Sequence, residues 1–260
     1  MSRNLRLIAR LDVKAPNLVK GVQLEGLRKL GDPNAFARDY YAQGIDEILY
    51  MDIVASLYER NSLLDIIKKT TEDVFVPITV GGGIRTLEDV KMALRAGADK
   101  VAINTAALKN PTLIREVSET FGSQCMVASI EAKFNGNTFE AYYDNGREHS
   151  HRDAIEWACE CEQNGAGELL ITSVDREGTR KGFDINLIQA VCRHVDIPVI
   201  ASGGMGTLED LLALALQSDV DAIAMASILH YGTVSVNDIR EFALNNQLKV
   251  RPHLSEKQAA

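Results

Sequence analysis

The stretch VPITVGGGIRTLEDVKMALRAGADKVAINTAAL at residues 76–108 decides the fold, because it recurs without a gap as IPVIASGGMGTLEDLLALALQSDVDAIAMASIL at residues 197–229. The same offset, from 76 to 197, matches GIDEILYMDI (44–53) to GAGELLITSV (165–174). Further upstream, IARLDVK from residue 8 matches VASIEAK from residue 127. The sequence therefore contains two copies of one unit, and the fold has to accommodate both.

Within each copy, short β-branched or apolar runs alternate with longer segments of helical periodicity. The expected strands lie near 5–12, 47–53, 76–80, 100–104, 126–131, 168–173, 197–202 and 221–226. The expected helices lie near 33–43, 60–72, 86–96, 111–120, 152–164, 184–194, 207–216 and 235–246. The nearly continuous hydrophobicity of the strand segments is typical of parallel strands that are covered on both faces.

Eight strand–helix units in a chain of 260 residues predict an α/β protein with the (β/α)8 TIM-barrel fold. A doubly wound open sheet is the alternative, but a two-fold repeat closes into a ring more naturally. We therefore expect a single barrel domain over residues 1–260, built from two duplicated half-barrels.

The composition sets further limits on the function. With 46% hydrophobic residues, 25% charged residues and a net charge of −8, the chain reads as an acidic globular protein and not as a nucleic-acid binder. No apolar run suits a secretion signal or a membrane span, so a cytoplasmic protein is expected. The four cysteines form no CxxC pair and are expected to be reduced thiols. The five histidines show no HxxxH pattern, although His149 and His151 are close, so neither a metal site nor a cofactor is expected.

Two glycine-rich segments follow strands at duplicated positions, Gly81-Gly82-Gly83 after the third strand and Ser202-Gly203-Gly204 after the seventh. The active site of such a barrel lies at the C-terminal ends of the strands. Glycine there lets backbone amides approach an anion, and the following helix points its positive end the same way. The fourth and eighth strands add Asn104-Thr105 and Ala226-Ser227. Glycines that only make tight turns are the alternative, but the duplication favours two phosphate sites and an elongated ligand with a phosphate at each end.

Two other segments are expected to contribute to these sites. The segment Asp175–Thr179 after the sixth strand contains Gly178 and Thr179, which are further donors beside the second phosphate. Lys20 is expected in a long loop after the first strand, from which it can reach over the barrel mouth and hold a phosphate. A solvated loop lysine is the alternative for Lys20.

The repeat also places an acid at the end of two opposite strands, Asp12 in the first and Glu131 in the fifth. Two carboxylates that face each other across a closed pocket serve as general base and general acid when their surroundings separate their pKa values. The alternative is that they form salt bridges with their neighbours Lys14 and Lys133. We expect Asp12 and Glu131 to be catalytic.

These residues, together with several longer strings, resemble the cyclase subunit of imidazole glycerol phosphate synthase over essentially the whole chain. The strings are LDVK (11–14), LVKG (18–21), TVGGGIR (79–85), RAGADKVAINTAA (95–107), FGSQC (121–125), GAGELLITSVDREGT (165–179) and IASGG (200–204). The sister sugar-isomerase barrel of histidine synthesis shares the duplication and the glycine segments but not these strings.

The resemblance implies a lyase that takes ammonia from a glutaminase partner and uses it on an open-chain ribulosyl aminoimidazole carboxamide ribonucleotide, which carries two phosphates. The products are imidazole glycerol phosphate and aminoimidazole carboxamide ribonucleotide. Asp12 matches the first catalytic aspartate of that family, and Glu131 falls where the second, also an aspartate, is expected. The full set expected to contact substrate and phosphates is Lys20, Gly82, Gly83, Asn104, Thr105, Thr172, Gly178, Ser202, Gly203, Gly204, Ala226 and Ser227.

Four charged residues, Arg6, Glu47, Lys100 and Glu168, fall at strand starts, so they should form one layer at the N-terminal mouth of the barrel. Opposite charges inside a barrel usually neutralise each other. The resemblance implies that this layer is a gate for ammonia, with the glutaminase docked on that face in a heterodimer. A cluster that serves only stability is the alternative.

Several positions depart from the usual pattern of the family. Arg10 stands where a small residue, commonly cysteine, is usual, and strand alternation points Arg10 and Asp12 to the same side. An Arg–Asp pair there would lower the pKa of Asp12. Glu131 is one methylene longer than aspartate, at a place where about 1 Å can change a rate ~100-fold. Glu177 is likewise longer than expected, and His149-Ser150-His151 stands in a loop where the family tends to carry Thr-Gly.

Because these departures cluster at the catalytic face and spare the charged layer, two other functions stay open. One is a paralogue that passes ammonia onward for amidation of a surface-polysaccharide sugar, together with a sugar amidotransferase. The other is a scaffold that only activates a glutaminase, and the two phosphate sites argue against it.

Overall fold

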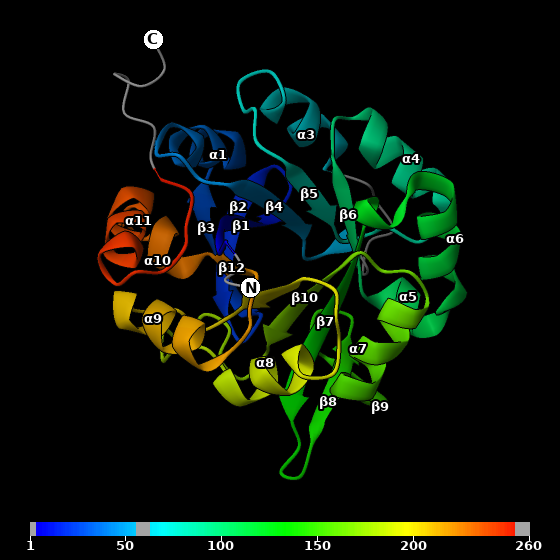
Figure 1. Cartoon of the computed structure of the whole chain (residues 1–260). Helices are drawn as coiled ribbons and strands as arrows, with labels where there is room; N and C mark the ends of the chain where they lie inside the picture. Colours follow the sequence, from blue (N-terminus) through cyan, green and yellow to red (C-terminus); the bar gives the residue numbers. More distant parts are fainter. Residues whose placement is uncertain (1–3, 56–62, 253–260) are drawn as a thin grey trace.

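The computed structural model describes residues 4–55 and 63–252. Parallel strands form a closed ring in the order β1, β4, β5, β6, β7, β10, β11, β12 and back to β1, with helices around the outside (Figure 1). The strands of the ring are β1 (Arg6–Lys14), β4 (Glu47–Asp52), β5 (Ile78–Gly81), β6 (Lys100–Ile103), β7 (Met126–Phe134), β10 (Glu168–Ser173), β11 (Val199–Ser202) and β12 (Ala222–Met225). The predicted (β/α)8 barrel is thus confirmed.

The helices alternate with these strands as expected. They are α1 (Pro33–Ala42), α3 (Leu64–Thr70), α4 (Leu87–Arg95), α5 (Thr105–Lys109), α6 (Thr112–Phe121), α7 (Ala154–Gln163), α8 (Ile185–Cys192), α9 (Leu208–Gln217), α10 (Ser227–His230) and α11 (Val236–Asn245). Residues 60–62 of the helix predicted over 60–72 lie outside the described residues. The short helices α5 and α10 were not expected, because five or four residues are too few for a periodic pattern.

The duplication is visible in the local structure of the two halves. Helix α4 begins with a capping box between Thr86 and Asp89, and α9 begins with the same box between Thr207 and Asp210. In each box the threonine hydroxyl accepts from the backbone amide three residues on, and the aspartate carboxylate accepts from the cap's own amide. Both helices therefore start at the same point after their glycine segments.

The apolar core has two parts. Most buried apolar residues lie between the strands and the helices, while a second cluster fills the inside of the ring. The inner cluster includes Ile8, Leu49, Val127, Leu170 and Ile200, each from a different strand. Strand alternation sends every second side chain inward, so these residues close the barrel centre and leave its two ends for polar groups.

Each half-barrel also carries an antiparallel hairpin after its first strand. In the first half the hairpin is β2 (Asn17–Val22) and β3 (Glu25–Gly31), and in the second half it is β8 (Phe139–Tyr143) and β9 (Glu148–Asp153). Strand β8 also pairs antiparallel with β7, and the turn between β7 and β8 projects beyond the ring of helices (Figure 1). The expectation of an open loop around Lys20 was wrong, since Lys20 lies in β2; the interpretation of residues 149–151 as a loop was wrong as well, since they lie in β9.

No helix among residues 4–55 and 63–252 combines the length and the apolar character that crossing a membrane requires.

Candidate active site

A cavity of about 410 Å³ opens at the C-terminal ends of the strands in the first half-barrel. Four of the predicted phosphate contacts line it, namely Gly82, Gly83, Asn104 and Thr105. Gly82 has a φ of +86°, and a Cβ there would lie 2.1 Å from the carbonyl oxygen of Asp52. A side chain at this position would collide with the backbone, so glycine is required for the close turn.

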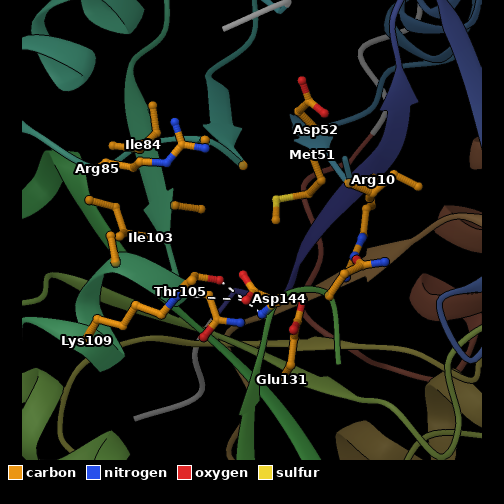
Figure 2. A pocket seen from close by; sticks show the side chains of 17 residues that line it. Arg10, Met51, Asp52, Ile84, Arg85, Ile103, Thr105, Lys109, Glu131 and Asp144 are labelled. Carbon is orange, nitrogen blue, oxygen red and sulfur yellow. Dashed lines mark hydrogen bonds and ion pairs between the residues drawn. The ribbon is translucent and has the colours of Figure 1, made fainter. Parts of the chain in front are cut away.

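Sequence reasoning missed two cations on the wall of this cavity, Arg85 and Lys109. Figure 2 shows them on one side of the cavity and Arg10 on the other. A guanidinium of Arg85 donates to the Ala55 carbonyl at 2.6 Å, and Lys109 Nζ lies 3.8 Å from a carboxylate oxygen of Asp144. Arg85 is the last residue of the string TVGGGIR, and Lys109 is the last residue of a short helix. In the sequence both are isolated basic residues, and no motif marks them as pocket residues.

A second, smaller pocket lies at the duplicated position in the other half. It is lined by Gly178, Ser202, Gly203, Gly204, Ala226 and Ser227, all of which were predicted. Gly204 has a φ of +110°, and a Cβ there would lie 2.1 Å from the Gly182 carbonyl oxygen. Arg180 also lines this pocket, and its guanidinium lies 4.5 Å from the centre of the Tyr231 ring. A cation was not predicted here, because Arg180 follows the recognised segment and carries no motif.

Asp12 is buried at the end of β1 between two cations. Arg10 Nε donates to Asp12 Oδ1 at 2.8 Å, and Lys20 Nζ donates to Asp12 Oδ2 at 3.0 Å. Lys20 also forms an ion pair with Glu177, and it is only 2% exposed. The predicted Arg10–Asp12 pair is confirmed, and the alternative pairing with Lys14 is not what the structure contains. Lys20 lies beneath the mouth, held by two carboxylates, and does not reach over it.

Burial by itself would raise the pKa of Asp12, but the adjacent charges of Arg10 and Lys20, with their hydrogen bonds, hold it far below its ordinary value. The same contacts raise the pKa values of the two cations, against the effect of their own burial. Asp12 is therefore a carboxylate at every physiological pH, and both of its oxygens accept hydrogen bonds.

Arg10 connects Asp12 to the second pocket. Its Nη1 donates to Thr172 Oγ1 at 3.0 Å and to Ser202 Oγ at 3.1 Å. Thr172 is buried and is not among the residues that line either pocket, so its hydroxyl serves Arg10 in this structure. Arg10 also lines the first cavity, which places one guanidinium between the two predicted phosphate sites.

Glu131, at the corresponding end of β7, has different surroundings. Its Oε2 accepts a hydrogen bond from the Gly146 amide at 2.7 Å, and its carboxyl group lines the first cavity (Figure 2). Burial raises its pKa to about 7, assisted by the negative charges of Asp12 and Asp144 and opposed by Arg10 and the Gly146 amide. The alternative pairing with Lys133 is absent, since Lys133 lies 5.8 Å from the centre of the Tyr142 ring. Glu131 therefore exists in both protonation states near neutral pH.

At the opposite end of the barrel, the four predicted gate residues form one closed ring of ion pairs. Arg6 pairs with Glu47 at 2.5 Å and with Glu168, and Lys100 pairs with Glu47 at 3.2 Å and with Glu168 at 2.9 Å. Burial opposes the charge on Arg6, but the two glutamates raise its pKa above the ordinary value. The predicted charged layer at the N-terminal mouth is confirmed, and each cation in it touches both acids.

The fold and the duplicated site together indicate the class of protein to which the chain belongs. The chain is a barrel of the histidine-biosynthesis type, since a family model described as "Histidine biosynthesis protein" matches residues 6–235. Imidazole glycerol phosphate synthase subunit HisF of Legionella pneumophila is 63% identical over 208 residues, which cover 80% of this chain and 98% of that protein. The subunit HisF of Myxococcus xanthus is 48% identical over 246 residues, 95% of this chain and 97% of its own length. That of Pyrococcus furiosus is 47% identical over 246 residues, with 95% and 98% covered. The chain therefore belongs to the family of imidazole glycerol phosphate synthase subunit HisF.

Proposed function

We propose that this chain is the cyclase subunit of imidazole glycerol phosphate synthase and works in histidine biosynthesis. In this proposal it uses ammonia from a glutaminase to convert the bisphosphorylated ribulosyl precursor into imidazole glycerol phosphate and aminoimidazole carboxamide ribonucleotide. The observation that carries the assignment is the unequal acid pair at the equivalent ends of β1 and β7. Glu131 lines the first glycine-lined pocket, and Asp12 is buried behind Arg10, which lines that pocket and donates to Ser202 of the second. Membership of the family supports the same reaction.

The two pockets provide a site for each end of the substrate. Gly82, Gly83, Asn104 and Thr105 hold one phosphate, with Arg85 and Lys109 as counter-charges on the cavity wall. Gly178, Ser202, Gly203, Gly204 and Ser227 hold the other, beside Arg180. Backbone amides suit phosphate because they are held in place without a cost in side-chain ordering, and the cations add charge-assisted hydrogen bonds.

The two acids divide the proton transfers between them. We assign the role of general base to Asp12, which stays ionised. Both of its oxygens accept hydrogen bonds from cations and it lines neither pocket, so the substrate has to displace Arg10 or Lys20 from one oxygen before a proton is transferred. Glu131 has a pKa of about 7 and is partly protonated in the cell, so it donates a proton as general acid. Lys20 and Arg10 position Asp12 through both of its oxygens and keep its charge from being neutralised.

The charged ring at the N-terminal mouth is the proposed entrance for ammonia. Arg6, Glu47, Lys100 and Glu168 are joined by ion pairs at this end, and in this proposal the passage of ammonia requires one of these pairs to open. We take Lys100 as the moving part, because a single ammonium group on a flexible side chain is more easily displaced than the planar Arg6 guanidinium, and because both glutamates are buried. A glutaminase docked on this face would deliver ammonia directly into the barrel.

Amidation of a polysaccharide sugar is not favoured, because the relatives compared above carry the name of the histidine-pathway subunit. The assignment is tested with the purified chain, the ribulosyl substrate and a high concentration of ammonium salt. Turnover to the two named products and rescue of a histidine auxotroph lacking this subunit are the expected results. Absence of both, with a folded protein, would remove the cyclase assignment.

A further inference from the structure

A cluster of potential metal ligands lies on the β8–β9 hairpin, outside the active site. It consists of Glu140 on β8 and His149 and His151 on β9, and one ligand atom from each lies within 4.8 Å of the others. None of the three is among the residues that line the two phosphate pockets. Glu140 is buried while both histidines are exposed, so an ion from solution can reach the cluster.

The fold brings these side chains together through an irregularity in β9. The hairpin pairs Tyr142 with His149 and Glu140 with Asp153, so β9 carries extra residues between the two pairs. This bulge contains His151, which has a φ of +58°, a left-handed conformation that few residues other than glycine adopt. The His151 amide donates to Glu140 Oε1 at 2.9 Å, which fixes the carboxylate next to both imidazoles.

The distances between the ligand atoms fit a small tetrahedral ion. In a zinc site with ligands at about 2.0–2.1 Å, neighbouring ligand atoms are about 3.3 Å apart. Nδ1 of His149 lies 3.2 Å from each Glu140 oxygen, and Nδ1 of His151 lies 3.6 Å from Oε1. An ion can therefore enter with little rearrangement of the donors.

Neighbouring groups also hold the His149 ring in an orientation that suits metal binding. Nε2 of His149 lies 3.3 Å from the Tyr142 hydroxyl, so the ring is held with Nδ1 toward Glu140. An imidazole whose other nitrogen is hydrogen-bonded in this way is typical of metal sites.

We propose that Glu140, His149 and His151 bind one divalent transition-metal ion, best fitted by Zn²⁺, with a fourth coordination position open to solvent. Two imidazole nitrogens and one carboxylate oxygen suit zinc, nickel or copper, whereas magnesium and calcium prefer oxygen ligands throughout. The expectation of no metal site rested on helical histidine spacing. Here two histidines two residues apart share a strand face, and the third ligand comes from the partner strand.

The bound ion joins β8 to β9 near the active site. The turn between these strands contains Gly146, whose amide donates to Glu131, and Asn145, whose side chain donates to the Leu24 carbonyl at 3.3 Å. Zinc therefore acts as a clamp on the hairpin that carries this turn. The clamp does not depend on which reaction the barrel catalyses.

The test is a titration of the tag-free chain with zinc chloride, followed by calorimetry in a thiol-free reducing buffer. The wild type is expected to bind one equivalent, and His149→Ala/His151→Ala is expected to bind on the order of 100-fold more weakly. His194→Ala is the matched control, because this exposed histidine lies elsewhere with its ring bonded to the Ala190 carbonyl. The control should bind zinc like the wild type.

Glu140→Gln provides a second variant that keeps both histidines and the shape of the third ligand. It should weaken zinc binding while its circular dichroism matches the wild type, and added magnesium should not displace zinc. Zinc should raise the Tm of the wild type and not that of the double variant. The proposal is overturned if the wild type binds no zinc, or if the double variant binds it as tightly and another group holds the ion.

Discussion

The two half-barrels share a fold but not a chemistry, and the difference lies at the ends of β1 and β7. In the first half, Asp12 contacts two cations, and its pKa lies far below the ordinary value. In the second half, Glu131 contacts a backbone amide, and its pKa rises to about 7. The residue two positions before the acid is Arg10 in one copy and a buried serine, Ser129, in the other. Arg10, a cation that has no counterpart in the second copy, thus accounts for much of the difference between the pKa values of the two acids.

The comparison teaches how a symmetric scaffold acquires an asymmetric function. Duplication supplies two strands, two glycine segments and two acids at equivalent positions. Acid–base catalysis requires the opposite of equivalence, because one group has to accept a proton while the other donates one. The structure meets this requirement by changing the neighbours of the acids and not the backbone that carries them.

The largest expected effect comes from neutralising the acid of the first half. Asp12→Asn should lower the ammonium-dependent kcat by about 1,000-fold or more, because it removes the proposed general base while keeping a hydrogen-bond acceptor. Lys14→Ala is the control, since Lys14 is the exposed neighbour that does not pair with Asp12. A well-folded Asp12→Asn enzyme with normal turnover would show that the buried carboxylate has no role in proton transfer.

Neutralising the acid of the second half, Glu131, should lower kcat less than neutralising Asp12 does, and it should change the pH dependence of kcat. Glu131→Gln should reduce kcat by about 100-fold, in the lower part of the range for a general acid. In the wild type, kcat should fall as the pH rises through about 7, because Glu131 loses its proton there. Stopped assays between pH 5 and 9 test this, with Lys133→Ala as control. An identical pH profile in Glu131→Gln contradicts the assignment of that limb to Glu131.

The same two acids predict opposite effects of pH on stability. Glu131 has a folded pKa of about 7 against an ordinary value of 4.5, so its contribution is present below 4.5 and lost as the pH rises through 7. The difference corresponds to about 3 kcal/mol. Asp12 contributes above its ordinary pKa and loses that contribution in acid. Urea unfolding of Glu131→Gln at pH 4.5 and 8 should show a smaller loss of stability between these values than the wild type does.

Making the first half resemble the second tests the role of Arg10. Arg10→Ser should raise the pKa of Asp12 toward its ordinary value, so that the acid limb of the pH–stability curve, followed by urea unfolding, moves to higher pH. The variant should also be less stable, since Lys20 alone then faces the carboxylate. Ser129→Ala, at the equivalent position in the other half, should leave the acid limb in place. A limb that stays put in Arg10→Ser would assign the low pKa of Asp12 to Lys20.

The smallest effect is expected at the far end of the barrel. Lys100→Met should lower glutamine-driven turnover more than ammonium-driven turnover, changing their ratio by about threefold, or about 0.6 kcal/mol. The ring keeps Arg6 as its remaining cation, so the barrel should stay folded. Lys91→Met, on the exposed face of α4, is the control. Equal losses in both assays would show that Lys100 serves stability and not passage.

Much of this site could be predicted from the chain alone, and the failures have physical reasons. The glycines of the two pockets were predictable because a close turn after a strand requires glycine, which is visible in the sequence. The Arg10–Asp12 pair was predictable because residues two apart on a strand point to the same side. Arg85, Lys109 and Arg180 were missed because a lone basic residue has no pattern that separates a pocket from the surface. Lys20 was misplaced because its hairpin is stabilised by pairing with β1, a contact distant from its own composition.

By itself, the sequence determined the barrel, its two-fold division and the positions of the two acids, because repeats and strand periodicity are local and survive any packing. Only the tertiary structure decided which charges meet. The burial of Lys20 between Asp12 and Glu177, the pKa of about 7 at Glu131 and the grouping of Glu140 with His149 and His151 all depend on distances between strands. Electrostatic energies depend on the distance between charges and on how far water is excluded from them. The sequence alone specifies neither the distance nor the burial.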